Sequence, residues 1–376
     1  MTQNIGEGMR RIWSADLQNI VTAIRNKTFV YEEKEEKPRD WSKYDGAQLN
    51  EIADMFHAIN LAVDIASERV RSREKKRKRL PGGPRIPPDD VAKLMLLQGY
   101  FGFSNRVATG FLKVFTAIKF STAFSYKTLE RGYDPRCTRP ILDELFRLTN
   151  EWSNFNETVC GIDGSGDPTT MKINYESKRT DQRKKKVGVK TTQEVITTWP
   201  TTQKKGDFQY SVLSCGIHTK IIAGFSTTGN HHVGELSQAP DVMKQTSKNV
   251  PNLSIVVGDG LYANRPFCQL VYLCNAALYS IPKSNSTLRN RGYEDWSRMT
   301  YELVLDPQGF LDMFHNRSIS ETVNSMMKRR EPTPIRKRLP WRKDSEEHLK
   351  KDLHNLRQSC YLTYVAPGMT KMLLGG

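Results

Sequence analysis

The sequence contains no apolar run that approaches the roughly 18 residues of a membrane-spanning helix. Its first residues, MTQNIGEGMRRIW, also lack the apolar core of a signal peptide. From these two absences we expect a chain that has no membrane partner and functions in the cytoplasm.

Cysteine is scarce, and no two cysteines form a C-x-x-C pair. The spacing of the nearest two, Cys268 and Cys274, does not suit a zinc knuckle. The adjacent His231 and His232 cannot both face one ion on a regular element, so we expect a strand-to-helix turn there, with Glu235 near the helix start. These patterns predict a reducing compartment, no disulfide framework and no structural zinc.

Acidic residues are in deficit, with 41 Asp and Glu against 57 Lys and Arg, a formal net charge of +16 and a pI near 9.5. An excess of this size indicates a polyanionic partner or an anionic membrane surface and says nothing about the fold. Because no stretch has the pattern of a basic amphipathic membrane helix, nucleic acid is the favoured polyanion.

The first 150 residues have helical periodicity and few strand signals. We predict a helical region over residues 1–70, a basic linker rich in Pro and Gly over 71–90, and several short helices over 91–150. The short helices begin at Ser or Asp residues and are broken by Gly, which fits a helix-turn-helix-like arrangement that binds DNA. A plain helical bundle without DNA contact fits the same pattern.

Strand patterns begin near residue 155, and residues 151–376 are predicted to be a second domain. The segments ETVCGIDGSGD, YSVLSCGIHTKIIAGFSTTGN, NLSIVVGDGLYANR and AALYSIPKSN predict strands, and a helix over 314–330 and a C-terminal helix follow. Strands that then alternate with helices indicate a mixed α/β sheet flanked by helices.

Two aspartates follow apolar strands in the same way, Asp163 in CGIDGSG and Asp259 in VVGDGLY. Such a position places a carboxylate at the edge of the sheet where ligand sites of α/β proteins gather. Either aspartate alone is better explained as part of an Asp-Gly turn, and only the combination with a third carboxylate favours a site. Asp167, before Pro168, fits a cap in that turn better than a ligand.

The segment FHNRSISETVNSMMKRR adds a third carboxylate, Glu321. In a continuous helix, residues four and eleven positions apart share one stripe, which here brings Arg317, Glu321 and Lys328 together. Three carboxylates supply hard oxygen ligands for two Mg²⁺ or Mn²⁺ ions. Asp306 and Asp312 precede this helix, and we prefer Glu321 to either of them.

The order of these three carboxylates resembles the DDE triad of insertion-sequence transposases. That family carries a Y-(2)-R-(3)-E-(6)-K signature, and at these spacings the chain has Phe314, Arg317, Glu321 and Lys328. Phenylalanine in place of tyrosine keeps the ring but removes a hydroxyl donor to phosphate. The resemblance covers about residues 155–365 and implies a retroviral-integrase, RNase H-like catalytic domain.

The resemblance also implies an activity and its partners. We expect metal-dependent cleavage at terminal inverted repeats and strand transfer into target DNA, by a homodimer assembled on double-stranded DNA in a prokaryotic nucleoid. Asp163, Asp259 and Glu321 are then the catalytic metal ligands. The residues expected to contact DNA are Phe314, Arg317, Lys328, Lys283 at a strand end, and Lys184, Lys185 and Lys186 in a basic run.

Two rival functions remain open from the sequence. A metal-dependent nuclease of the same fold would share every ligand but would cut without joining. A DNA-binding protein derived from a transposase would have lost the chemistry, against which the intact triad argues. Arg317 and Lys328 also fit an ordinary solvated helix face, and Lys283 fits a solvated lysine equally well.

Overall fold

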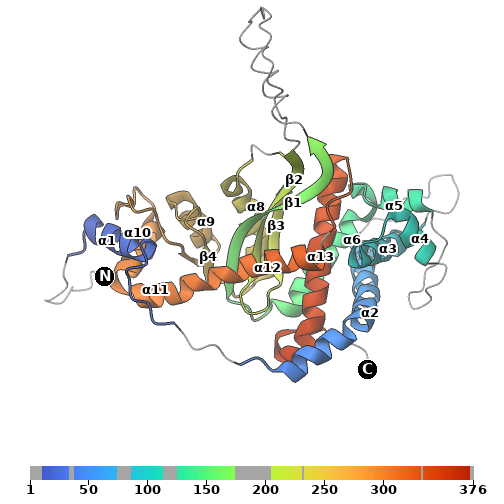
Figure 1. Ribbon diagram of the computed structural model, residues 1–376, viewed down its shortest axis with the longest axis horizontal. Helices are drawn as coiled ribbons and strands as arrows, with labels where there is room; N and C mark the ends of the chain where they lie inside the picture. The colour runs from blue at the N-terminus through green and yellow to red at the C-terminus, as the bar shows by residue number, and fades with distance from the viewer. Residues whose placement is uncertain are drawn as a thin grey trace, which may run out of the picture.

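The structure is a computed structural model that describes residues 11–33, 38–73, 86–112, 125–173, 205–230, 233–331 and 333–372. These residues form a mixed α/β protein with a five-stranded sheet, helices on both faces of the sheet and a helix-rich N-terminal part (Figure 1). The predicted mixed α/β class is therefore confirmed. Within these ranges, no helix combines the length and apolar character that crossing a membrane requires.

The sheet has the strand order β3-β2-β1-β4-β5. Its strands are β1 (Val159–Ile173), β2 (Lys205–Gly216), β3 (Ile222–Thr228), β4 (Ile255–Gly258) and β5 (Ala277–Tyr279). The pairs β1–β2 and β2–β3 are antiparallel, whereas β1–β4 and β4–β5 are parallel. The central strand β1 therefore borders both the antiparallel and the parallel half.

The prediction that the first strand ends in a turn at Asp163 is wrong. Strand β1 runs on to Ile173 and stays paired with β2 through Pro168, where the register shifts. Gly164 and Gly166 lie inside this strand, on the face opposite to that of Asp163. The antiparallel partner satisfies the backbone groups that a turn would have left to solvent.

Helices cover both faces of the sheet. On one face, α8 (Glu235–Asn249) packs Val242 and Met243 against Ile162 and Val212. On the other face, α12 (Ser318–Arg330) contributes to a small core. That core contains Phe146, Leu213, Cys215, Ile222, Phe225, Val323 and Met327. Figure 1 shows α12 passing in front of the strands.

Further helices complete the half of the molecule around β4 and β5. They are α1 (Ser14–Arg25), α9 (Arg265–Leu273), α10 (Glu294–Leu305) and α11 (Pro307–Phe314). The first of them comes from the N-terminus, yet Leu17 and Val21 are buried in the core of the sheet domain. Arg25 also donates to the carbonyl oxygen of Pro282 at 2.9 Å, just after β5.

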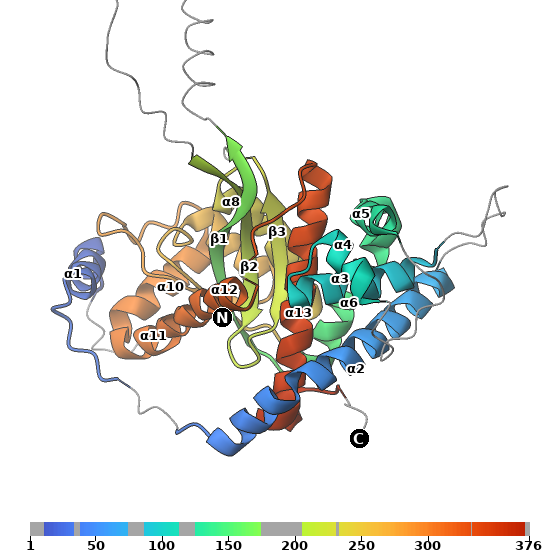
Figure 2. The ribbon, with the colours of Figure 1, turned by 45° about the vertical axis from the view of Figure 1, so that its right-hand side comes forward.

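The helix-rich part has its own core. Its helices are α2 (Trp41–Arg73), α3 (Pro88–Phe101), α4 (Asn105–Phe111), α5 (Tyr126–Gly132), α6 (Pro135–Ser153) and the C-terminal α13 (Pro340–Val365). Leu349, Leu353 and Leu356 of α13 are buried in this core. Figure 2 shows α13 between the sheet and the helices α3, α4 and α6. The C-terminal helix thus packs with the N-terminal helices, while α1 packs with the sheet, so the packing cuts across the predicted division at residue 150.

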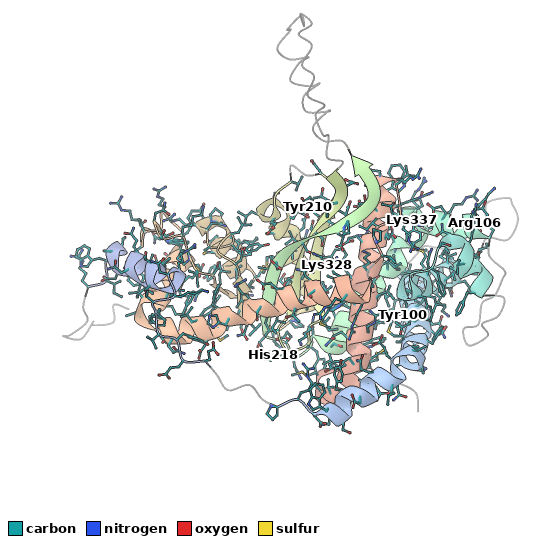
Figure 3. All side chains as sticks on the ribbon, in the orientation of Figure 1. Tyr100, Arg106, Tyr210, His218, Lys328 and Lys337 are labelled. Carbon is teal, nitrogen blue, oxygen red and sulfur yellow. The ribbon has the colours of Figure 1, made fainter. Side chains whose placement is uncertain are left out.

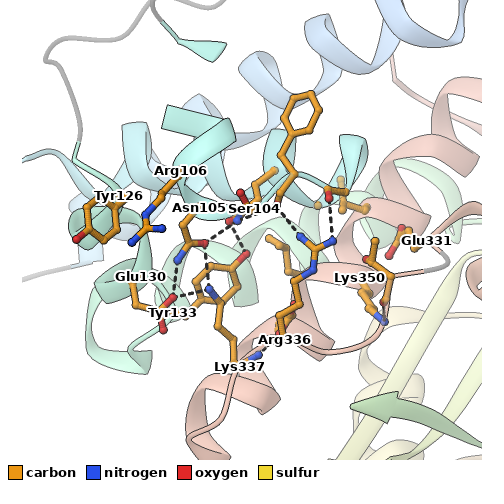
Figure 4. A pocket seen from close by; sticks show the side chains of 18 residues that line it. Ser104, Asn105, Arg106, Tyr126, Glu130, Tyr133, Glu331, Arg336, Lys337 and Lys350 are labelled. Atoms are coloured by element: carbon orange, nitrogen blue, oxygen red, sulfur yellow. Dashed lines mark hydrogen bonds and ion pairs between the residues drawn. The ribbon is translucent and has the colours of Figure 1, made fainter. Parts of the chain in front are cut away.

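A polar network joins the helix-rich part to the connection between α12 and α13, around a cavity of about 380 Å³ (Figure 4). Lys337 donates to Glu130 at 2.7 Å, and Asn105 donates to the same carboxylate oxygen at 2.6 Å. Arg336 donates to the carbonyl oxygens of Gly102 and Phe103 at 3.0 and 2.9 Å. These bonds fix where the chain leaves α12.

Candidate active site

Asp163 within β1 and Asp259 directly after β4 lie side by side on two neighbouring parallel strands. The β1–β4 register places Ile162 opposite Gly258, so the next residue on each strand is an aspartate. Asp259 accepts the backbone N–H of Leu261 at 2.9 Å, which holds its carboxylate at the start of the loop. Both aspartates are partly exposed. The structure therefore brings the first two predicted site residues to one place.

Helix α12 brings Glu321 to the cavity that Asp163 lines. This cavity of about 370 Å³ is bordered by Asp163, Ser165, Glu321, Asn324, Lys328 and Arg329. The Asn324 side-chain amide donates to Asp163 Oδ2 at 2.8 Å and so ties α12 to β1. The carboxylate of Glu321 is 55% exposed and forms an ion pair with Arg317.

A fourth carboxylate, Glu235, joins this group, although no sequence pattern predicts it as a site residue. Glu235 is the first residue of α8 and lies directly over Gly164, where an added Cβ would be 2.3 Å from Glu235 Cδ. The buried Tyr262 donates its hydroxyl to Glu235 Oε2 at 3.3 Å. The available signals were a glycine after Asp163 and an acid at a helix start, and neither indicates that the two segments meet.

The electrostatics of the site reflect this gathering of like charges. Burial raises the pKa of Asp163, and the charges of Glu321 and Asp259 raise it further against the hydrogen bond from Asn324. Burial also raises the pKa of Glu235, to which the charges of Asp259 and Asp163 add. A nearby cation would stabilise the ionised form of each carboxylate.

The carboxylates of the site are the kind of ligand that a divalent ion requires, but in the structure they are not arranged around one ion position. Carboxylate oxygens without sulfur or imidazole are what Mg²⁺ and Mn²⁺ prefer. Among the residues that the structure describes, however, no group of three or more His, Cys, Asp or Glu side chains is arranged to hold a metal ion. Glu321 is turned to Arg317, and Asn324 engages one oxygen of Asp163.

The prediction of one continuous helix over residues 314–330 is wrong. Helix α11 ends at Phe314, the 3₁₀ turn η1 (His315–Arg317) follows, and α12 begins at Ser318. Phe314 is only 9% exposed and packs in the core, with the Arg317 guanidinium 5.4 Å from its ring centroid. The interruption thus removes Phe314 from the stripe but keeps the Arg317–Glu321 pair.

The lysines predicted to contact DNA fall in different places. Lys328 is exposed on α12 and borders the Asp163 cavity; Figure 3 shows it where this helix crosses the sheet. Lys283 is exposed in the loop after β5. Lys184, Lys185 and Lys186 lie outside the described residues, as do His231 and His232.

The competing aspartates have other partners. The prediction that Asp167 caps a turn is wrong: it lies within β1, is 7% exposed, and faces the ammonium groups of Lys350 and Lys351 at 3.7 and 3.8 Å. Asp306 caps α11 by accepting the N–H of Gly309 at 2.9 Å. Asp312 accepts the Tyr31 hydroxyl at 2.9 Å. These contacts leave Glu321 as the carboxylate that shares a cavity with Asp163.

No protein-family model matches the chain, and no curated protein sequence matches it. The interpretation of the site therefore depends on two observations. One is the geometry of the carboxylates on β1, β4, α8 and α12. The other is the spacing of residues in the segment that contains Glu321.

Proposed function

We propose that the chain is a DNA transposase with an RNase H-like catalytic domain. The observation that carries the proposal is that Asp163 within β1 and Asp259 directly after β4 lie side by side on adjacent parallel strands, while Glu321 lines the same cavity as Asp163. The strand order supports the proposed fold, since an antiparallel β1–β2–β3 unit is extended in parallel by β4 and β5. The R-(3)-E-(6)-K spacing around Glu321 adds the resemblance to the transposase family.

The proposed substrate is double-stranded DNA, at the ends of the element and at its target. The net charge of +16 favours a polyanion, and Lys328 and Arg329 border the cavity where a phosphate would lie. The proposal includes a homodimer assembled on DNA, because two ends must be joined to one target.

The proposed chemistry uses two Mg²⁺ or Mn²⁺ ions held by Asp163, Asp259 and Glu321. Bound ions would activate a water or a 3′-hydroxyl and stabilise the leaving oxygen. The protein's own groups prepare the site: Asn324 orients the Asp163 carboxylate, and Lys328 attracts the phosphate. The ion pair with Arg317 holds Glu321 at the cavity but must open if both of its oxygens are to bind metal.

The test is a cleavage assay on duplexes carrying the inverted repeats that flank the coding sequence, with Mg²⁺ or Mn²⁺. We expect Asp163→Asn, Asp259→Asn and Glu321→Gln to reduce cleavage to background and to keep DNA binding, measured by gel shift in EDTA. Asp241→Asn, at an exposed position of α8, is the matched control and should cleave normally.

Each outcome bears on the proposal. Normal cleavage by any of the three variants would remove that residue from the site, and equal loss in Asp241→Asn would indicate a general effect of lost charge. Joining of pre-cut ends to a second duplex separates a transposase from a nuclease, which would cut without joining.

A further inference from the structure

A cavity of about 380 Å³, the α3–α13 cavity, lies between the helix-rich part and the connection from α12 to α13 (Figure 4). Its volume falls within the range of small-molecule sites, roughly 300–1,000 Å³. One wall is a stripe of α13 that includes Leu349 and Leu353, and the opposite wall is formed by Gly99 of α3 and by Gly102 and Phe103 after it. The walls are therefore partly apolar, and they include none of the four carboxylates of the candidate active site.

Three cations in the walls of this cavity already have acceptors. Arg336 donates to two backbone carbonyl oxygens, at 2.9 and 3.0 Å. Lys337 donates to Glu130 at 2.7 Å, and Lys350 donates to the carbonyl oxygen of Thr333 at 3.3 Å. An anionic ligand would have to replace these bonds before it could use the three cations.

The Glu331 carboxylate is different. Glu331 follows the last residue of α12, is 6% exposed, and receives no hydrogen bond on either carboxylate oxygen from the described residues. The Arg357 guanidinium lies 3.9 Å from Glu331 Oε1, too far for a hydrogen bond, and 3.1 Å from Glu51. Burial raises the pKa of Glu331 to about 7 against the nearby charges of Arg357, Lys350 and Lys351. A buried carboxylate without a donor is costly, and proteins rarely leave one so.

We propose that the α3–α13 cavity binds a small organic cation whose guanidinium or amidinium head pairs with Glu331. Such a planar head carries parallel N–H groups that can donate to both carboxylate oxygens at once, and its charge is opposite to that of Glu331. The apolar part of the ligand lies along Leu349 and Leu353.

Two other classes of ligand fit the cavity less well. A divalent metal ion requires several oxygen ligands, and within the described ranges no group of three or more His, Cys, Asp or Glu side chains is arranged to hold one. An anion would be repelled by the Glu331 carboxylate and would find Arg336, Lys337 and Lys350 already bonded.

Calorimetric titration of the full chain with benzamidine tests the proposal. Benzamidine carries a planar amidinium on an apolar ring, benzamide has nearly the same shape without the charge, and inorganic phosphate has the opposite charge. We expect the wild type to bind benzamidine and neither of the other two probes. Glu331→Gln should weaken benzamidine binding by about tenfold or more, because it removes the charge of the acceptor. The matched control is Glu68→Gln, at an exposed position of α2 outside the cavity, which should bind as the wild type does.

Thermal unfolding gives a second readout that does not depend on heats of binding. Glutamine keeps the shape of the side chain and removes an unpaired buried charge, so Glu331→Gln should fold and melt no lower than the wild type at pH 8. Benzamidine should raise the melting temperature of the wild type and of Glu68→Gln but not that of Glu331→Gln.

Each remaining outcome would overturn the inference. Equal binding of benzamidine by the wild type and Glu331→Gln, or equal binding of benzamide and benzamidine, would show that this carboxylate selects no cation. Binding of phosphate alone, or of none of the three probes, would also refute it. If Glu331→Gln does not fold, the three probes on the wild type still decide. No arm uses DNA or a metal ion, so a failure here leaves the proposed function to its own cleavage assay.

Discussion

Adding one methyl group at Gly164 tests whether Glu235 belongs to the carboxylate group. In Gly164→Ala the new Cβ would lie 2.3 Å from Glu235 Cδ and 2.5 and 2.7 Å from its two oxygens. Ordinary contact begins at about 3.5 Å. The side chain of Glu235 must therefore leave its place beside Asp163 and give up the hydrogen bond from Tyr262.

The expected size of the effect follows from these contacts. Overpacking costs about 1–3 kcal/mol, and here the lower part of that range applies because the clash is with the movable end of a side chain. The lost Tyr262 bond, at 3.3 Å, contributes on the order of 1 kcal/mol. Moving a carboxylate away from Asp163 and Asp259 offsets part of this. We expect Gly164→Ala to lower the free energy of unfolding by about 1–2 kcal/mol.

The assay is a double-mutant cycle with Glu235→Ala, in which free energies of unfolding are measured by urea titration in EDTA. Truncating Glu235 removes the clash, so the cost of Gly164→Ala should nearly vanish in that background, giving a coupling of about 1–2 kcal/mol. Gly166→Ala is the matched control. Its nearest contacts would be an ordinary 3.6 Å to Phe208 and 3.7 Å to Tyr210, and it should be neutral.

Two results would refute this reasoning. If Gly164→Ala costs the same with and without the Glu235 side chain, then Glu235 does not lie over Gly164. If Gly164→Ala is as harmless as Gly166→Ala, then the start of α8 does not pack over Gly164 as the structure has it.

The remaining predictions concern charge. Lys328→Ala should weaken DNA binding at low salt. It should also reduce the slope of the logarithm of the binding constant against the logarithm of the salt concentration by about 0.9, as measured by fluorescence anisotropy. An unchanged slope would mean that Lys328 contacts no phosphate. The pKa of Asp163 is higher in the folded protein than in the unfolded chain, where it is about 3.9. Protonated Asp163 therefore stabilises the fold fully below a pH of about 3.9, and this stabilisation is lost as the pH rises through the folded-state pKa. Asp163→Asn should therefore unfold at a higher temperature than wild type at pH 7 in EDTA, with a difference that shrinks as the pH is lowered towards 3.9; a negative or pH-independent difference would contradict the raised pKa.

The sheet was largely predictable from the sequence because local signals and tertiary packing agree there. Apolar alternation bounded by turn residues predicted β2 and β3, and IVVG followed by Asp-Gly predicted the end of β4 at Asp259. Asp163 is the exception. The sequence Gly-Ser-Gly-Asp after Asp163 favours a turn, but pairing with β2 continues the strand, and Glu235 and Tyr210 lie against Gly164 and Gly166 on the face of β1 that these glycines share.

In the segment that carries Glu321, helical periodicity did not predict the position of every side chain. A regular helix from Phe314 onward would place Phe314, Arg317 and Glu321 on one stripe. The 3₁₀ turn η1 changes the rotation per residue between Phe314 and Ser318, so Phe314 is directed into the core. The pair Arg317–Glu321 survives because only the start of the stripe lies in the 3₁₀ turn.

Glu235 was not predictable as a site residue, for a different reason. Its position depends on where α8 begins relative to β1, and no residue spacing in the sequence indicates that these two elements meet. Glycine at 164 permits the close approach of Glu235, but a glycine after an aspartate has a simpler explanation in a turn.

The distribution of charge explains how an acidic site can serve a basic protein. Of the four carboxylates at the site, Asp163, Glu235, Asp259 and Glu321, two are buried enough for burial to disfavour their ionised form, since burial raises the pKa of Asp163 and of Glu235. In the proposed function, this centre would by itself repel a phosphate, whereas Lys328 and Arg329 at its border and the net charge of +16 would attract the rest of the DNA. The two effects would have different ranges, because the net charge would act along the whole DNA backbone and the carboxylates only at one phosphate. The proposal therefore predicts that DNA binding without metal and cleavage with metal can be separated, and that a divalent ion between carboxylate and phosphate converts the first into the second.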